Sequence, residues 1–469
     1  NYDEPASGAS RGGFSSLVDP SGAGCPGGVS ERRIYDRYSR VSAVEQCIRG
    51  RSYRFGIGYD ALGRTHTLTY PDGEVVAYEY DRVGRLSRVP GWIDAQLYDV
   101  DGRVAEIRYA NGTRMRIGYD RDRGQVDSER LLRGATTLFD AGYGYRLDGS
   151  LHSSTSRTNA MNLSFANDEL GRITAVSGDR SQTWSYDVAG NLLRNSRLGL
   201  YTYPAQGPNG CGNAPCLAPH GVRTAGNFAL EYDANGLVSQ IIDNATGRRR
   251  AIDWTVDRRP MTIQEYDGTT TLYTYDGWGR RVVDERIGDI VRHVGGLIED
   301  SSVSGLTKYY YAGGRMIGAS RAGHRTWLHA DRAGSVRVTT DAQGAVVGRF
   351  DYDVFGRDLA AQGSTGAGGF GANRLGDAML MGARVYDPVI ERFLGPDTMV
   401  PNLLNSQAFN RYLFNYGAPT AWVDPSGHQP IGIGTTYSPG GVGAFDMGSG
   451  WMHQPWTFAA GTPPGFAGP

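Results

Sequence analysis

Apolar and polar residues alternate along most of this chain, and short turn-forming stretches interrupt the alternation at regular intervals. In residues 74–89, Val76, Tyr78 and Tyr80 alternate with other residues, and Leu86 follows a short polar stretch. Such period-2 alternation predicts a strand before the polar stretch and a return strand that starts at Leu86.

The polar stretches have the chemistry of tight turns. Asp81 can accept hydrogen bonds from the backbone ahead of it, and Gly84 can take the left-handed conformation that closes a turn. A second kind of turn lies between such units, as in "YPDGE" from Tyr70 and "YANGT" from Tyr109, both typical of hairpins. Each unit is therefore predicted to be strand, turn, strand, turn.

The unit repeats. Clear copies of Tyr-Asp-x-x-Gly-Arg or close variants are "YDALGR" at Tyr59, "YDRVGRL" at Tyr80, "YDVDGRV" at Tyr98, "YDVAGNL" at Tyr186, "YDANGLV" at Tyr232 and "YDGWGRR" at Tyr275. Between Tyr59 and Tyr119, successive copies start 21, 18 and 21 residues apart. A period near 20 residues indicates one supersecondary unit per repeat.

The predicted fold class is all-β. One hairpin leaves unpaired edges, so successive hairpins are expected to pair into one long antiparallel β-hairpin ribbon, about 25–30 Å wide. The natural twist of strands should make this ribbon curl and spiral. The positions off the apolar face are largely Arg, Glu, Thr and Ser, which predicts a wet inner surface; the pattern leaves open whether the curl encloses a cavity.

The composition narrows the class of partner. The 469 residues carry 48 basic and 49 acidic side chains, a net charge of -1 that argues against nucleic acid or an anionic membrane as partner. We find no apolar run near the roughly 20 residues of a membrane-spanning helix and no signal peptide. Because the first residue is Asn1, a processed piece or a fragment of a longer chain is expected.

Four cysteines are too few for a fold built on disulfides. Cys211 and Cys216, in "CGNAPC", are predicted either to close a local disulfide in an oxidising compartment or to stay free. Neither this pair nor the histidines show the spacing of a metal site, so no metal and no cofactor are predicted.

Three longer sequence segments in the last third of the chain resemble a known protein family. "WLHADRAGSVRVTTDAQGAVVGRFDYDVFGR" from Trp327, "MGARVYDPVIERFLGPDT" from Met381 and "NRYLFNYGAPTAWVDPSGH" from Asn410 resemble, in order, the core domain of Rhs or YD-repeat proteins. This family includes bacterial Rhs polymorphic toxins, the B and C components of Tc toxin complexes, and teneurins. The resemblance covers residues 31–428.

The resemblance implies a hollow shell, or part of one, closed by a core plug that encloses a C-terminal toxin or other cargo. It divides the chain into four parts. These are a Gly/Ser-rich N-terminal segment (1–30), the YD-repeat ribbon (31–325), the Rhs-associated core (326–428) and a Gly/Pro/aromatic-rich tail (429–469).

The resemblance also implies that the core is a single-turnover aspartyl protease that cuts its own chain. Such chemistry needs two carboxylates that can share a proton. By position in the motif they are Asp397 and Asp424, and Arg392 is expected to orient or stabilise one of them. Taken alone, the same residues fit a turn cap and a loop residue, so whether this chain is an enzyme stays open.

The cut is expected after the Asp-Pro-Ser-Gly-His motif, between His428 and Gln429. Many relatives have Leu at the position of His428, so this chain differs from them at the residue directly before the expected cut. The tail beyond it has a single charged residue, Asp446, and many Gly, Pro and aromatic residues. We interpret it as a tail held inside or against the shell, the chain's own cargo.

Two further functions remain as alternatives. One is a cell-surface adhesion or scaffold protein without proteolysis, and the other is a Tc-type shell subunit that a partner chain completes. The expected partners are the chain's own tail, a secretion apparatus or a toxin-complex subunit. The resemblance implies a secreted or cell-surface, delivered protein and points to a bacterial source.

Overall fold

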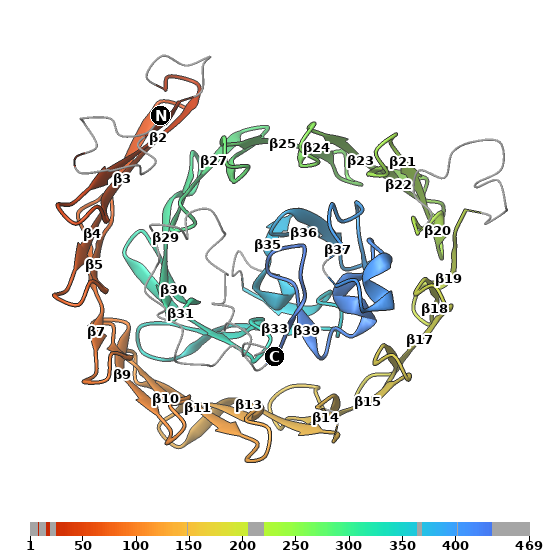
Figure 1. The fold of residues 1–469 in the computed structure, drawn as a ribbon, viewed down its shortest axis with the longest axis horizontal. Helices are drawn as coiled ribbons and strands as arrows, with labels where there is room; N and C mark the ends of the chain where they lie inside the picture. The colour runs from red at the N-terminus through yellow and green to blue at the C-terminus, as the bar shows by residue number, and fades with distance from the viewer. Residues whose placement is uncertain are drawn as a thin grey trace, which may run out of the picture.

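The structure is a computed structural model that describes residues 8, 16–18, 25–147, 149–204, 220–363, 368–400 and 402–433. Its regular elements there are β-strands and three short 3-10 helices, and the prediction of an all-β fold is confirmed. The strands form a long ribbon, which we call the wall, followed by a small domain that starts after Gln362 (Figure 1). We call this small domain the core domain; the Rhs-associated core expected at 326–428 also includes residues 326–362, whose strands pair with the wall.

The wall consists of β1(Ser16–Val18), β2(Val29–Tyr35), β3(Val41–Ile48), β4(Arg51–Tyr59), β5(Thr65–Thr69), β6(Val75–Ala77), β7(Glu79–Tyr80), β8(Leu86–Arg88), β9(Ile93–Tyr98), β10(Val104–Tyr109), β11(Thr113–Tyr119), β12(Val126–Arg133), β13(Thr136–Tyr145), β14(Leu151–Thr155), β15(Leu163–Asn167), β16(Ile173–Gly178), β17(Gln182–Tyr186), β18(Leu192–Asn195), β19(Gly199–Thr202), β20(Thr224–Ala225), β21(Phe228–Tyr232), β22(Val238–Asp243), β23(Arg248–Trp254), β24(Pro260–Gln264), β25(Thr270–Tyr275), β26(Arg281–Arg286), β27(Asp289–Val294), β28(Ile298–Ser301), β29(Gly305–Ala312), β30(Arg315–Arg321), β31(His324–Ala330), β32(Val336–Thr340), β33(Val346–Tyr352) and β34(Asp358–Gln362). The core domain consists of η2(Gly369–Gly371), β35(Asn373–Leu375), β36(Ala378–Met381), β37(Arg384–Asp387), β38(Arg392–Phe393), η3(Ser406–Phe409), η4(Phe414–Gly417), β39(Trp422–Val423) and β40(Ile431–Gly432).

The repeat folds as its pattern predicts. β7 and β8 pair across a turn in which Asp81 N donates to Arg85 O at 2.8 Å and Gly84 N to Asp81 O at 3.0 Å. The Asp81 carboxylate accepts the N–H of Val83 and of Arg85, and its other oxygen accepts Arg85 Nε at 2.8 Å. Gly84 has a φ of 91°, which a residue with a Cβ rarely adopts.

The same arginine links one repeat to the next. The Arg85 guanidinium lies over the ring of Tyr98, 4.3 Å from its centroid, and the hydroxyl of Tyr98 donates to Leu86 O at 2.6 Å. We call this set of contacts the Tyr–Asp–Arg clasp. It recurs with Arg40 and Tyr59, Arg64 and Tyr80, and Arg103 and Tyr119.

The strands curl because the pairing slips by one residue at the repeated aromatic position. Such register shifts occur between Gly58 and Tyr59, between Gly118 and Tyr119, and between Thr274 and Tyr275. A bulge adds a local bend and extra right-handed twist to its strand. Because the bulges recur at the same end of successive strands, they bend the ribbon in one direction.

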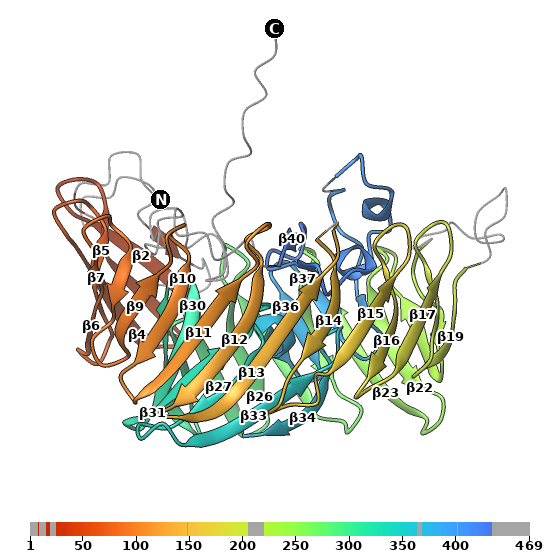
Figure 2. The ribbon, with the colours of Figure 1, turned by 90° about the horizontal axis from the view of Figure 1, so that it is seen from below.

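The wall winds into a spiral of more than one turn. In Figure 1 it runs around a ring from β2 to β25, and β27–β31 then pass inside β3–β9 as the inner turn. Figure 2 shows the strands crossing the wall obliquely from one rim to the other. Strand pairing is continuous in sequence order from β9 to β34, while β1–β6 and β7–β8 form two shorter sheets at the start of the wall.

Polar contacts join the inner turn to the outer turn. Tyr70 Oη donates to Tyr309 O at 2.6 Å, and Trp327 Nε1 donates to Trp92 O at 3.0 Å. The chain's single lysine, Lys308, lies 2.6 Å from Asp72 Oδ2. The overlap of the two turns is thus bonded at fixed positions and does not depend on apolar contact alone.

The prediction of a wet inner surface is wrong for the part of the outer turn that the inner turn overlaps. Ile57, Tyr78 and Met115 of the outer turn belong to one apolar cluster with Val294 and Val338 of the inner turn. Side chains alternate between the two faces of a strand, so the polar positions of the outer turn point away from this cluster. Burial against a second layer, and not contact with water, decides which face points inward.

The core domain lies inside the ring (Figure 1). Its apolar residues form a second cluster with the inner face of β14–β25. Arg250 of the wall, 1% exposed, donates from Nη1 to Asp387 Oδ2 at 2.8 Å. Glu391 accepts from Trp184 Nε1 at 2.7 Å, and Tyr412 Oη donates to Gly236 O at 2.6 Å.

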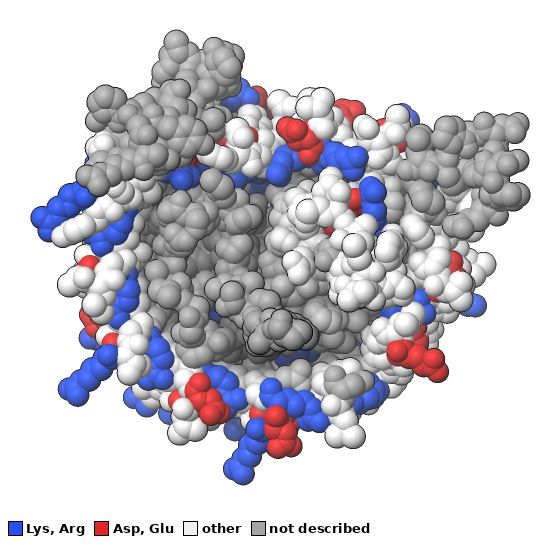
Figure 3. Space-filling model, viewed as in Figure 1, with Lys and Arg blue, Asp and Glu red and all other residues white. Residues whose placement is uncertain are grey.

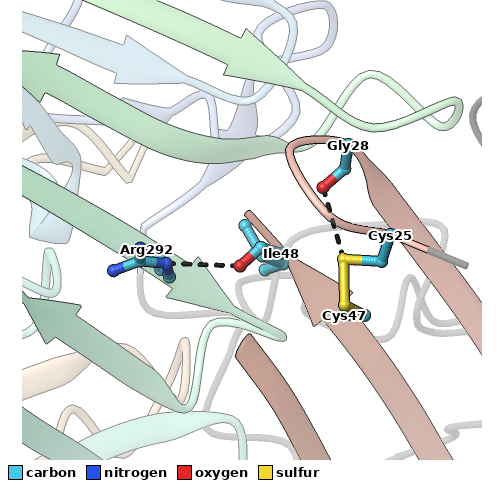
Figure 4. The surroundings of a disulfide bond; sticks show 5 residues. All are labelled: Cys25, Gly28, Cys47, Ile48 and Arg292. Atoms are coloured by element: carbon cyan, nitrogen blue, oxygen red, sulfur yellow. Dashed lines mark hydrogen bonds between the residues drawn. A yellow bond between two sulfur atoms is a disulfide. The ribbon is translucent and has the colours of Figure 1, made fainter. Parts of the chain in front are cut away.

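A disulfide joins Cys25 and Cys47 at the start of the ribbon (Figure 4). The next residue along β3, Ile48, accepts a hydrogen bond from Arg292 Nε of the inner turn at 3.2 Å. The covalent link therefore sits at the overlap of the two turns. The predicted pair Cys211 and Cys216 lies outside the described residues.

Charge is distributed without a dominant sign. On the face shown in Figure 3, basic and acidic side chains both lie around the ring, whereas the described surface of the core domain is largely uncharged. This distribution is in keeping with the net charge of -1.

The clasp predicts a measurable cost for removing one tyrosine hydroxyl. Tyr80→Phe deletes the hydrogen bond from Oη to Thr65 O (2.7 Å) and keeps the ring under Arg64. We expect the free energy of unfolding to fall by about 1 kcal/mol, measured by chemical denaturation. Tyr38→Phe is the matched control, because Tyr38 is 62% exposed and should change it by less than about 0.5 kcal/mol. Equal effects of the two variants would contradict a stabilising clasp.

Glu129 predicts a pH dependence of stability. It is 1% exposed on β12, and its Oε2 accepts from Arg332 N of the inner turn at 3.0 Å and from Tyr143 Oη at 2.9 Å. Burial, with a smaller effect of the nearby Asp331 charge, raises the pKa of Glu129 from 4.5 to about 7. Its contribution to stability is therefore complete below pH 4.5 and is lost as pH rises through 7, a change of about 3 kcal/mol.

Glu129→Gln keeps an oxygen acceptor but removes the titration. We expect the fall in melting temperature between pH 4.5 and pH 8 to be smaller in this variant than in the wild type. Glu79→Gln, at a 40% exposed side chain, serves as the control and should leave the pH dependence unchanged. A pH dependence in Glu129→Gln that equals the wild-type curve would exclude Glu129 as its source.

Candidate functional site

Three segments of the core domain meet at one point. Arg384 is the first residue of β37, Asp397 lies in the loop after β38, and Asp424 directly follows β39. The hairpin of β36 and β37 positions Arg384 through a tight turn at Gly382, which has a φ of 52°. The two carboxylates thus come from separate loops and are brought together by the packing of this small domain.

Asp397 and Asp424 share one guanidinium. Arg384 Nη2 lies 3.2 Å from Asp397 Oδ2 and 3.1 Å from Asp424 Oδ2. Each aspartate is only 3% exposed. The Arg384 guanidinium itself lies 3.4 Å from the centroid of the Phe393 ring, which fixes its plane.

The surroundings push the pKa values of the two carboxyls apart. Burial raises the pKa of Asp424 above its usual 3.8, and the charge of Asp397 acts in the same direction. Burial also opposes ionisation of Asp397, but the hydrogen bond with His428 and the charge of Arg384 lower its pKa below 3.8. Asp397 therefore ionises more readily than Asp424, a difference of the kind that assigns separate roles to paired carboxyls.

The predicted cleavage segment lies against this pair. His428 Nδ1 is 2.7 Å from Asp397 Oδ1. The backbone N–H groups of His428 and Gln429 both donate to Ser426 Oγ at 3.1 Å. The bond between His428 and Gln429 is thus held near both aspartates. The His428 side chain contacts Asp397, and the N–H of Gln429 contacts Ser426, whose hydroxyl donates to Asp424.

Two glycines let this segment approach the hairpin of β36 and β37. A Cβ at Gly427 (φ 72°) would lie 2.1 Å from Met381 O, and a Cβ at Gly382 would lie 2.0 Å from Ser426 O. Ala383 N donates to Ser426 O at 2.9 Å, and Arg384 Nε donates to Gly427 O. The glycine of the Asp-Pro-Ser-Gly-His motif is therefore required by close packing.

The structure brings together Asp397, Asp424, His428 and Gln429 but places Arg392 elsewhere. Arg392 Nη2 donates to Tyr203 Oη of the wall at 2.7 Å. The arginine beside the carboxylates is Arg384, which the sequence analysis did not single out. It lies in the quoted phrase "MGARVYD", but nothing in its spacing distinguishes it from Arg392.

A cavity of about 430 Å³ lies between the wall and the core domain. Leu163 and Trp184 of the wall line it together with Thr420 and Ile433 of the core domain. Ile433 N donates to Ala421 O at 2.8 Å. The chain thus passes from the candidate site to the cavity within a few residues.

In the part of the chain that the structure describes, no three His, Cys, Asp or Glu side chains are grouped to hold a metal ion. No helix among these residues has the length and apolar character needed to cross a membrane.

Comparisons with known proteins agree with the repeat and the spiral. A family model described as RHS Repeat matches residues 59–89. Teneurin-1 of Gallus gallus is 24% identical over 424 residues, which are 83% of this chain and 13% of that protein. Residues 59–89 thus carry the repeat of the RHS Repeat family. Another similar protein is the tRNA3(Ser)-specific nuclease WapA of Bacillus spizizenii, 24% identical over 45% of this chain and 9% of WapA.

Solved structures share the fold. A crystal structure of TcdB2-TccC3-TEV has a TM-score of 0.66 at 15% identity and covers 86% of this chain and 24% of that chain. A Photorhabdus luminescens Tc holotoxin pore structure has a TM-score of 0.61 at 14% identity, over 86% of this chain and 23% of that chain. The chain therefore spans about a quarter of the length of these structures, and it has the shell-like fold that they share.

Proposed function

We propose that this protein is part of an Rhs-type shell that encloses its own C-terminal polypeptide and that its core domain cleaves the bond between His428 and Gln429. The observation that carries the proposal is the contact of both Asp397 and Asp424 with one arginine beside the segment 426–429. The core contributes Arg384 to this site in the role first assigned to Arg392.

The arrangement supports hydrolysis by a pair of carboxyls. Asp397, with its lowered pKa, removes a proton from the attacking water, and Asp424, with its raised pKa, supplies one. Hydrolysis then needs Asp397 ionised and Asp424 protonated, so its rate falls when pH drops below the pKa of Asp397 or rises above that of Asp424. Because the attacked bond is in the same chain, each molecule reacts once.

The spiral and the cavity support enclosure. The core domain packs on the inner face of β14–β25, and Ile433, which follows the proposed cut closely in the sequence, lines the cavity between core and wall. A cleaved segment that starts at Gln429 would thus begin inside the ring. Its low charge suits apolar surroundings, since Asp446 is its single residue of the Asp, Glu, Lys and Arg types.

The likeness to TcdB2-TccC3 and to a Tc holotoxin pore supports a toxin-complex subunit or a secretion apparatus as partner. In that case, further shell strands complete the enclosure. The disulfide between Cys25 and Cys47 supports a secreted or cell-surface location, because such bonds persist in oxidising compartments.

Cleavage is tested by intact-mass spectrometry of the purified protein. We expect the wild type to give two polypeptides, 1–428 and 429–469. Asp397→Asn and Asp424→Asn should each give one uncut chain, because an amide can neither accept nor deliver the required proton. Asp101→Asn, at a 63% exposed side chain of the wall, is the matched control and should be cut as the wild type is. An uncut wild type would exclude the proposed protease activity but would not contradict the shell.

Enclosure is tested separately by limited proteolysis. If 429–469 lies inside the shell, it should co-elute with 1–428 on size-exclusion chromatography and resist added protease until the shell is denatured. Asp424→Asn should show the same protection, because enclosure does not require the cut. Rapid digestion of 429–469 in both forms would favour the surface adhesion or scaffold function.

A further inference from the structure

Ser426 occupies the centre of the candidate site. Its hydroxyl donates to Asp424 Oδ1 at 3.1 Å, and the same Oγ accepts the N–H of His428 and of Gln429, each at 3.1 Å. One side chain therefore connects the carboxyl of Asp424 to the nitrogen of the bond that would be cut. The N–H of Gln429 meets this hydroxyl and not a carboxylate.

The backbone around Ser426 is fixed. Ser426 O accepts from Ala383 N at 2.9 Å, and the left-handed Gly427 fits against Met381 O with no room for a Cβ. The position of Oγ relative to Asp424 and Gln429 is therefore set by the hairpin of β36 and β37. The side chain itself is exposed, so a larger residue with the same hydroxyl has space there.

Hydrolysis of an amide needs a proton donor for the leaving nitrogen. While the peptide bond is intact, its nitrogen is conjugated with the carbonyl and acts as an N–H donor. Once water has added to the carbonyl carbon, the conjugation is lost and the nitrogen carries a basic electron pair. A hydroxyl already within hydrogen-bond distance can then reverse its role from acceptor to donor.

We propose that Ser426 is a catalytic proton relay that passes a proton from Asp424 to the departing nitrogen of Gln429. This inference rests on the proposed cleavage. Water forms a C–O bond to the carbonyl carbon of His428 and gives a proton to Asp397. The hydroxyl proton of Ser426 moves to Gln429 N, the carboxyl proton of Asp424 moves to Ser426 Oγ, and the C–N bond breaks with its electron pair on nitrogen.

The products balance the single water consumed. His428 ends in a carboxyl group, Gln429 begins with an amine, Asp397 holds a proton, Asp424 is ionised and Ser426 is unchanged. A purely structural role is the competing explanation, because a serine in such a turn commonly caps backbone N–H groups. The two roles differ in whether the proton of the hydroxyl moves during the reaction.

The test follows the rate of appearance of 429–469 after cell-free synthesis of the full chain, in H₂O and in D₂O. Ser426→Ala should slow cleavage by about 10²- to 10⁴-fold, the usual range for loss of a general acid. Ser426→Thr, which keeps the hydroxyl, should remain within about tenfold of the wild type. The dependence of the rate on deuterium content should be curved for the wild type and Ser426→Thr, because more than one proton moves.

Three results would overturn the relay. They are a Ser426→Ala rate equal to the wild type, a Ser426→Thr rate as low as that of Ser426→Ala at an unchanged melting temperature, and a linear deuterium dependence in the wild type. In each of these cases cleavage itself stands. If the wild type is never cut, both the relay and the proposed protease activity are excluded. No other result excludes both.

Discussion

The wall depends on one interaction, the clasp in which an arginine pairs with the aspartate of its own turn and stacks on the tyrosine of the next repeat. In the copy at Arg85, the guanidinium meets Asp81 and lies over Tyr98, whose hydroxyl closes the contact at Leu86 O. A single exposed ion pair contributes little to stability. Here the pair is joined to a stacked ring and a backbone hydrogen bond, and it recurs along a ribbon in which each repeat contacts its neighbours.

The clasp also sets the shape. The repeated aromatic residue is where the strand pairing slips, so the position that joins neighbouring repeats is also the position that bends the ribbon. Enough repeats bring the inner turn against the outer turn, where the apolar faces of both are covered. The core domain covers the remaining inner face of β14–β25. The spiral is therefore stabilised between layers as well as along the strand ladder.

The candidate site lies within the core domain that the wall surrounds. Asp397 and Asp424 are each 3% exposed, and both contact the guanidinium of Arg384. Burial raises the pKa of Asp424, while His428 and Arg384 lower that of Asp397. The difference between the two carboxyls, on which the proposed chemistry depends, thus arises from burial and from neighbouring residues of the core domain.

The strand, turn and repeat could be read directly from the sequence, because alternation, Asp and Gly act through neighbours a few residues apart. The residues Asp397, Asp424, His428 and Gln429 could be located through a continuous motif, although their chemistry stays a proposal. Arg384 could not be distinguished from Arg392, since only the fold decides which guanidinium faces the carboxylates. The pairing of Cys25 with Cys47 follows from the register of the neighbouring strands β2 and β3. The inward direction of the apolar face was decided by tertiary structure, because it depends on which distant strands lie against each other.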